Sequence, residues 1–198
     1  TDQFSNIDTS ATGTLTITPK GVTLTADSAT VAYDGSKKEI NTFTSSVTGL
    51  SFPGVSAHGE GIKVNTDPGY AVTFTGVTEN ETKDSTGNYV VTTATAGALK
   101  ITPNETAITV VVPETASKEY DGTALTKTEH DDFTVTGVPE GFTWTAAADG
   151  TVTNVTPGEG EKAVNAITEF KIFNADGEDV TDQFSNIDTS ATGTLTIT

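Results

Sequence analysis

The chain has 198 residues and is strongly acidic, with 27 acidic against 10 basic residues and a net charge of −17. A surface of this sign repels nucleic acid and anionic lipid, so we expect neither a nucleic-acid partner nor membrane insertion of this segment. The absence of cysteine excludes a disulfide framework and thiolate chemistry.

The first predicted element, Thr14–Thr18, lies in a segment that occurs twice. Residues 181–198 repeat residues 1–18 letter for letter, which gives a period of 180 residues. Identity over this length indicates a recent duplication, so we infer a longer array of near-identical copies. We interpret residues 1–18 as the closing strand segment of the preceding repeat. Because an apolar strand face is not stable alone, we expect it to dock on the first domain or on a neighbouring molecule's sheet edge.

A weaker repeat divides the period into two unequal parts. Three anchors recur in the same order: a closing strand followed by proline, a Tyr-Asp-Gly turn and a Val-Thr-Gly segment. Their first and second occurrences are GTLTIT-Pro19 and GALKIT-Pro103, Tyr33-Asp34-Gly35 and Tyr120-Asp121-Gly122, and Val47-Thr48-Gly49 and Val135-Thr136-Gly137. The anchors predict two β domains, a first half-unit of residues 19–102 and a second half-unit of residues 103–198.

Threonine is the most frequent residue, and its β-branched side chain favours strands over helices. Alternation of apolar residues with threonine predicts short strands separated by Asp-Gly and Pro-Gly turns. The strands expected in the first half-unit are 22–25, 30–33, 41–48, 70–75, 88–93 and 97–102. Those expected in the second are 108–112, 118–120, 132–136, 142–146, 166–173 and 192–198. Only Glu159–Ile167 is compatible with a helical turn.

These strands predict an all-β fold class of two tandem Ig-like or β-sandwich-type domains placed end to end. A β-grasp-like fold with one short helix is the alternative. At the joints only Pro19-Lys20-Gly21 or Pro103-Asn104-Glu105 separates one predicted strand from the next. Proline fixes its own φ and keeps the preceding residue extended, so the joints predict a stiff, elongated rod.

Residues suited to catalysis are few. The two histidines, His58 and His130, belong to no motif with a nucleophile, and Asp131-Asp132 is an ordinary acid pair in so acidic a chain. The sequence therefore predicts a protein that is not an enzyme, with no catalytic residues, no cofactor and no metal.

Two acidic segments contain oxygen ligands that calcium accepts. They are Asn174, Asp176, Glu178, Asp179 and Asp182, and, in the first half-unit, Glu79, Asn80, Glu81 and Asp84. Neither fits the spacing of an EF-hand, so we interpret them as acidic turns.

A lysine–asparagine cross-link is a further alternative, since some bacterial surface domains join these side chains covalently. Lys118 with Asn165, Asn174 or Asn186 would be the pair, but the first half-unit has Val31 at the matching position. A solvent-facing lysine is therefore the preferred interpretation.

The aromatic residues predict mainly structural roles. Tyr33 and Tyr120 each precede an Asp-Gly turn, where a tyrosine can cover the edge of the core. Phe142 and Trp144 have no counterpart in the first half-unit. We expect Trp144 to fill the core, and a sugar-stacking role is the alternative.

The order of these motifs resembles a known family. The Tyr-Asp-Gly turn, the Val-Thr-Gly segment, the stretch Ala175–Thr181 (ADGEDVT) and the ending Gly-Thr-Leu-Thr-Ile-Thr-Pro are similar to tandem MBG-type repeats of bacterial cell-surface adhesins. The resemblance covers nearly all of residues 19–198. The first half-unit departs from it, because Asn80–Asp84 replaces the acidic turn. The resemblance implies an Ig-like or β-grasp-like stalk domain with no catalytic residues.

The resulting functional expectation is a structural stalk on a Gram-positive or gut bacterium, extracellular and anchored to the cell wall. Its partners would be the neighbouring identical repeats, and its copy number would set the reach of a distal adhesin domain. The alternatives are weak binding of a host glycan, mucin or matrix protein through many copies, and homotypic association in a biofilm.

Overall fold

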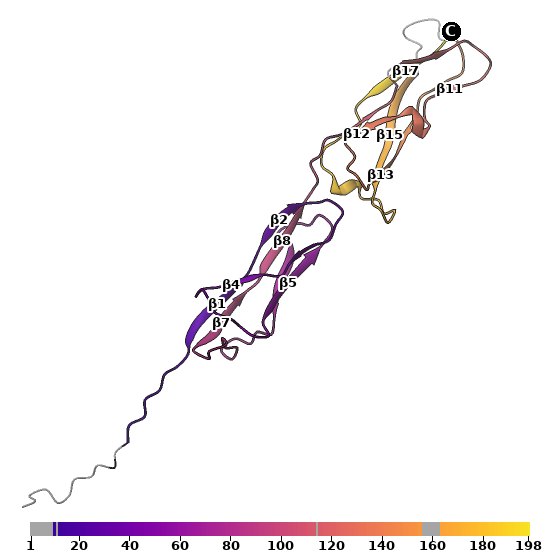
Figure 1. The fold of residues 1–198 in the computed structure, drawn as a ribbon. Coiled ribbons are helices and arrows are strands. Elements are labelled where there is room, and N and C mark those ends of the chain that lie inside the picture. Colours follow the sequence, from indigo (N-terminus) through magenta and orange to yellow (C-terminus); the bar gives the residue numbers. More distant parts are fainter. Residues whose placement is uncertain (1–9, 11, 114, 156–162) are drawn as a thin grey trace, which may run out of the picture. The chain divides into compact units, whose positions relative to one another are not determined.

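The computed structural model describes residues 10, 12–113, 115–155 and 163–198, and these form an all-β protein (Figure 1). Its only helices in the described ranges are two three-residue 3₁₀ turns, η1 (His130–Asp132) and η3 (Thr181–Gln183). The all-β fold class predicted from the threonine-rich alternation is confirmed.

The first half-unit contains eight strands. Two of them, 70–75 and 97–102, have the predicted bounds. Strand β5 was not predicted, because its inward positions are Ala57 and Gly59 and carry no apolar alternation. A Cβ atom on Gly59 would lie 2.7 Å from the Ala71 carbonyl oxygen, so glycine permits the close approach of β6. The strands are β1 (Lys20–Ala26), β2 (Ala29–Ala32), β3 (Lys38–Ile40), β4 (Phe43–Ser45), β5 (Ser56–Gly61), β6 (Tyr70–Thr75), β7 (Tyr89–Thr95) and β8 (Gly97–Thr102).

In its described residues, the second half-unit contains nine strands. They are β9 (Ile108–Val111), β10 (Thr115–Lys118), β11 (Leu125–Thr126), β12 (Thr134–Thr136), β13 (Thr143–Ala148), β14 (Thr151–Val152), β15 (Ala163–Phe173), β16 (Ile187–Asp188) and β17 (Thr192–Ile197). The helical turn allowed at Glu159–Ile167 is wrong for residues 163–167, which belong to β15. Pairing with β17, from Ala163↔Leu195 to Ala166↔Thr192, makes them a strand. Residues 159–162 lie outside the described part.

The sheet topology repeats along with the sequence anchors. Strand β1 pairs antiparallel with β4 and parallel with β7, and β9 pairs antiparallel with β12 and parallel with β16. The larger sheets have the orders β2-β8-β6-β5-β3 and β10-β17-β15-β13, and β11 pairs with β14. In both, the closing strand (β8 or β17) pairs in parallel with the short strand before the Tyr-Asp-Gly turn (β2 or β10). The weak internal repeat is therefore also a repeat of strand pairing.

The described chain divides into two compact units. The first contains the described residues up to Ser28 with Ile40–Gly59 and Ala71–Ala98, and the second contains Ala29–Glu39, Glu60–Tyr70 and Leu99–Thr198. This division does not follow the half-unit boundary at Thr102. The tandem-domain boundary remains a prediction.

The core of the first compact unit forms around alternating residues of β1. Val22 and Leu24 pack with Phe52 and Val91, and all four are buried. The intervening Thr23 and Thr25 are half-buried and exposed. One face of β1 is thus removed from water, which is the main source of stability for such a strand.

The N-terminal segment has no strand in the described positions 12–18, and all seven residues are exposed. Leu15 is 100% and Ile17 95% exposed, so the expectation that this part docks on the first half-unit is wrong. The same letters at 192–198 contain β17, in which Leu195 and Ile197 are 0% exposed. The difference lies in the partners, because β17 has a strand on each side. Residues 1–9 and 11 lie outside the described part.

The glycine of the second Val-Thr-Gly anchor, Gly137, lies against the backbone of Ala107, and this close approach can be tested. Gly137 has a φ of +85°, and a Cβ there would lie 1.9 Å from the Ala107 carbonyl oxygen, whereas at Gly141 (φ +87°) a Cβ would meet nothing. Both alanine variants carry the same left-handed strain, so Gly137→Ala should cost at least about 2 kcal/mol more than Gly141→Ala. Urea unfolding followed by fluorescence of Trp144, the only tryptophan, measures the difference. Equal losses for the two variants would contradict the steric explanation.

Candidate functional site

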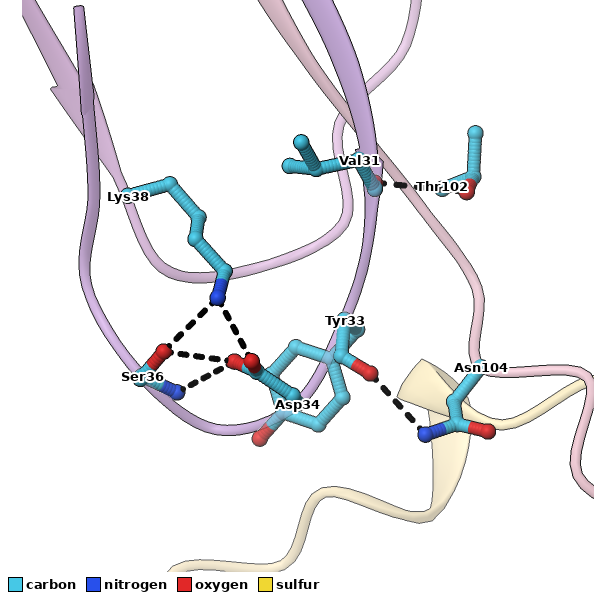
Figure 2. Close-up of polar contacts among 7 residues, drawn as sticks. All are labelled: Val31, Tyr33, Asp34, Ser36, Lys38, Thr102 and Asn104. Carbon is cyan, nitrogen blue, oxygen red and sulfur yellow. Dashed lines mark hydrogen bonds and ion pairs between the residues drawn. The ribbon is translucent and has the colours of Figure 1, made fainter.

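The first Tyr-Asp-Gly turn is held by one carboxylate (Figure 2). Oδ1 of Asp34 accepts hydrogen bonds from the backbone N–H and the hydroxyl of Ser36, at 2.9 and 2.7 Å. Oδ2 of Asp34 pairs with Nζ of Lys38 at 2.5 Å. The hydrogen bond from Lys38, followed by those from Ser36, lowers the pKa of Asp34 to about 2.

The second turn has the same arrangement, but its lysine comes before the aspartate in the chain and not after it. Oδ1 of Asp121 accepts from the backbone N–H and hydroxyl of Thr123, at 2.9 and 2.7 Å, and from Nζ of Lys118 at 2.8 Å. Here the lysine precedes the aspartate by three residues, whereas Lys38 follows Asp34 by four. The hydrogen bonds from Lys118 and Thr123 lower the pKa of Asp121 well below its usual range.

The position of Lys118 can be compared with the alternative of a lysine–asparagine cross-link. Its amine bonds to the turn, whereas the buried amide of Asn165 accepts from the Gly150 N–H and donates to the Lys127 carbonyl. The other two candidate asparagines are also engaged elsewhere, Asn174 with the N–H groups of Asp176 and Glu178, and Asn186 with the carbonyl of Glu105. The structure thus brings Lys118 to a turn aspartate and to none of the three asparagines.

Each turn is also fixed to the end of a closing strand. The N–H of Tyr33 donates to the Thr102 carbonyl at 2.9 Å, and the N–H of Tyr120 donates to the Thr198 carbonyl at 2.8 Å. The hydroxyls of the two threonines donate back, to the carbonyls of Val31 and Lys118. Thr102 and Thr198 are therefore each held by the Tyr-Asp-Gly turn that precedes them in the chain.

The two tyrosines differ in their surroundings. Tyr33 is 2% exposed and Tyr120 is 56% exposed. Within the second compact unit, the ring of Tyr33 lies 5.9 Å from that of Phe184 and 6.1 Å from that of Phe142, and these two phenylalanines are 5.4 Å apart. Burial, followed by the nearby charges of Asp182, Glu178 and Asp34, raises the pKa of Tyr33. We call Tyr33, Phe142 and Phe184 the aromatic cluster.

Polar side chains at the joint complete this arrangement. Asn104 follows Thr102 and Pro103, and its Nδ2 donates to the Tyr33 carbonyl at 2.9 Å (Figure 2). The backbone N–H of Asn104 donates to the Gln183 carbonyl, and Oε1 of the buried Gln183 accepts from the N–H of Val64 at 2.6 Å. Both ends of each contact belong to the second compact unit.

Sequence reasoning named Asn104 only as part of the joint and did not single out Gln183 or Phe184. The available signal was their position in the exactly repeated segment, directly after the acidic turn. Nothing in their residue types marks them as joint residues, because an amide and a phenylalanine are common in any domain.

In each acidic segment one aspartate accepts hydrogen bonds within its own turn. Asp179 accepts from the N–H and hydroxyl of Thr181, and Asp84 accepts from the N–H and hydroxyl of Thr86 and the N–H of Tyr89. Burial alone would raise the pKa of Asp84, but the bonds from Thr86 and the neighbouring N–H groups lower it. Among the residues that the structure describes, no group of three or more His, Asp or Glu side chains is placed to hold a metal ion.

Trp144 is half-buried and does not belong to the buried core, so the expectation that it fills the core is wrong. Its ring stacks on His130 with centroids 4.1 Å apart and an angle of 12°, and Phe170 lies 6.4 Å away. His130 therefore covers one face that a sugar would need. His130 also contacts Asp131 at 3.3 Å. The other histidine, His58, bonds through Nδ1 to the amide oxygen of Asn41.

Comparison with known proteins adds no relative: no protein-family model, no curated protein and no solved structure matches this chain. Within the described residues, no helix has the length and apolar character needed to cross a membrane.

The two tyrosines form a matched pair for testing the aromatic cluster. Tyr33→Ala removes a buried ring and should cost about 3–5 kcal/mol, as for other buried aromatics. Tyr120→Ala removes the equivalent but exposed ring and should cost less than about 1 kcal/mol. Urea unfolding followed by circular dichroism measures both. Similar losses would show that the turn, and not the cluster, determines the contribution of the tyrosine.

The carboxylate of the first turn predicts a pH dependence. The folded-state pKa of Asp34, about 2, is below the unfolded value of 3.8, so its stabilisation is present above about pH 4 and is lost as the pH falls toward 2. Asp34 is exposed and its partner Lys38 is half-buried, so Asp34→Asn should cost at most about 1 kcal/mol at pH 6. The difference between wild type and variant should vanish near pH 2.

Denaturant melts across this pH range test the expectation. Asp176→Asn is the control, because this aspartate is exposed and lies in a turn of the same acidic chain. A wild-type–D34N difference that stays constant between pH 6 and 2 would contradict the assigned role.

Proposed function

We propose that this chain is a structural stalk repeat of a bacterial cell-wall-anchored surface protein. In this proposal the copies form an elongated rigid rod, project a distal adhesin domain, and set its distance by their number. The exact 18-residue duplication supports an array, and the resemblance of the motifs to adhesin stalk repeats supports the location.

The observation that carries the proposal is the set of contacts at the joint. The side chain of Asn104 donates a hydrogen bond to the Tyr33 carbonyl. The side chain of Gln183 accepts one from the Val64 N–H. In both pairs the partners are far apart in the sequence. Tyr33 is at the same time buried against Phe142 and Phe184. A flexible linker would leave these groups in water, whereas a joint that must resist bending requires them to be satisfied and packed.

Tyr120 extends this reasoning to the next copy. It occupies the same place on the second turn that Tyr33 occupies on the first, and its ring is exposed. In an array, the residues following Thr198 would continue from the strand end to which Tyr120 is bonded. We therefore expect the next copy to cover Tyr120 in the way that the aromatic cluster covers Tyr33.

A spin-label measurement tests the stiffness on which the proposal depends. The chain has no cysteine, so labels can be placed at Thr73→Cys and Thr168→Cys, two exposed strand positions. A stiff joint gives one narrow distance distribution, because the two labels keep a fixed separation. Adding Asn104→Ala and Gln183→Ala should broaden it, since both polar contacts are removed.

An insertion of Gly-Ser residues after Thr102 serves as the flexible reference. A wild-type distribution as broad as that of the insertion variant would reject the rigid stalk. A panel of glycans, mucin and matrix proteins tests the alternative function in parallel, and saturable binding by this chain would favour a binding module.

A further inference from the structure

In the second half-unit, the first two strands pair in parallel with the last two. Strand β9 pairs with β16 at Ile108↔Ile187, and β10 pairs with β17 at Thr115↔Thr194 and at the three positions that follow. The offset between partners is 79 residues in both ladders (187 − 108 and 194 − 115). The opening and closing segments of this half-unit therefore keep one register through two sheets.

Backbone hydrogen bonds extend this pairing beyond the strands at each end. Before β9, the N–H of Asn104 donates to the Gln183 carbonyl at 2.9 Å, and the N–H of Ser185 donates to the Asn104 carbonyl at 3.0 Å. After β10, the N–H of Thr198 donates to the Lys118 carbonyl at 2.9 Å. All of these residues belong to the second compact unit. The two segments are thus bonded to each other from the joint to the closing residue.

Buried side chains hold the paired segments in this register. Ile108 and Val110 of β9, like Leu195 and Ile197 of β17, are at most 1% exposed. Because side chains alternate between the two faces of a strand, a slip by one residue would turn these positions toward water. Sliding one segment along the other therefore costs apolar burial as well as hydrogen bonds.

The parallel orientation determines how the ladders respond to tension along the chain. Such tension acts at Pro103 and at Thr198, so it pulls the opening segment toward its N-terminus and the closing segment toward its C-terminus. In parallel strands these pulls are opposed and lie along the strands, so the hydrogen bonds between them are loaded together. In an antiparallel pair the two pulled ends would lie side by side, and the bonds would break one after another.

We propose that β9 and β10, paired with β16 and β17, form a mechanical clamp that lets this half-unit carry tension without unfolding. The first half-unit repeats the pairing, with β1 parallel to β7 in one compact unit and β2 parallel to β8 in the other. A spacer needs only length, whereas a protein that stays folded under a pull needs a high barrier to forced unfolding. The clamp is a property of the half-unit, and only its use at a cell surface rests on the proposed stalk function.

Pulling the full chain in two directions tests the clamp. The chain has no cysteine, so handles can be attached through a cysteine added after Thr198 and through either Thr106→Cys or Glu119→Cys, both at exposed positions. Thr106 lies at the opposite end of the clamp from Thr198, so this pair shears the ladders. Glu119 lies at the same end as Thr198, so this pair peels them apart. We expect the unfolding force, measured with optical tweezers at one pulling speed, to be at least about twofold higher in shear, because several hydrogen bonds must break together.

Two isoleucines separate the clamp from general stability. Ile197 in β17 and Ile172 in β15 are both 0% exposed, but Ile172 lies opposite Trp144 of β13, outside the clamp. Both alanine variants should lose equilibrium stability in urea. Only Ile197→Ala should lower the shear force, because the contacts of Ile172 are still intact when the clamp ruptures. The Ile→Val variants at both positions give the same comparison if an alanine variant does not fold.

Two results would overturn the proposal. Equal unfolding forces in the shearing and peeling geometries would show that the parallel ladders add no resistance. Equal reductions of the shear force by the two isoleucine variants would show that the force follows overall stability and not the clamp. Neither handle pair spans the joint at Thr102, so the clamp can fail while the rigid stalk holds, and the stalk can fail while the clamp holds.

Discussion

Two-sided pairing of the closing strand is the constraint on which much of this structure depends. In the second half-unit, β17 joins β10 in parallel and β15 in antiparallel orientation, and in the first half-unit β8 pairs in parallel with β2. In a strand with a neighbour on each side, the backbone N–H and C=O groups are hydrogen-bonded on both edges. Its alternate side chains can then be fully buried. Leu99 and Ile101 of β8, like Leu195 and Ile197 of β17, are at most 1% exposed.

The turn and the joint are connected to these strand ends. The carbonyls of Thr102 and Thr198 accept from Tyr33 and Tyr120, so each Tyr-Asp-Gly turn is fixed where a closing strand ends. The aspartate of each turn accepts hydrogen bonds from the residue two positions later and pairs with a lysine. At the first strand end Asn104 follows after one proline and bonds back to the Tyr33 carbonyl. Strand, turn and joint are thus linked by a continuous series of hydrogen bonds.

The repeat shows how context changes the behaviour of one sequence. Tyr33 and Tyr120 share their turn chemistry, yet one ring is buried and the other exposed, because only Tyr33 has Phe142 and Phe184 beside it. Residues 12–18 and 192–198 share every letter, yet only the second copy contains a strand. In both cases the identity of the residue sets what it can do, and the neighbouring elements decide whether it does so.

The sequence by itself determined the all-β class, the order of most strands and the two turns, because these depend on local alternation and on Asp-Gly chemistry. Strands 70–75 and 97–102 even had the correct bounds. It could not determine β5, whose inward residues are Ala57 and Gly59, or the start of β15 at 163–165, since only pairing with β6 and β17 makes these segments strands. Nor could it show that His130 stacks on Trp144, or that Gln183 and Phe184 reach the joint. Those contacts join residues far apart in the chain, and only tertiary packing brings such residues together.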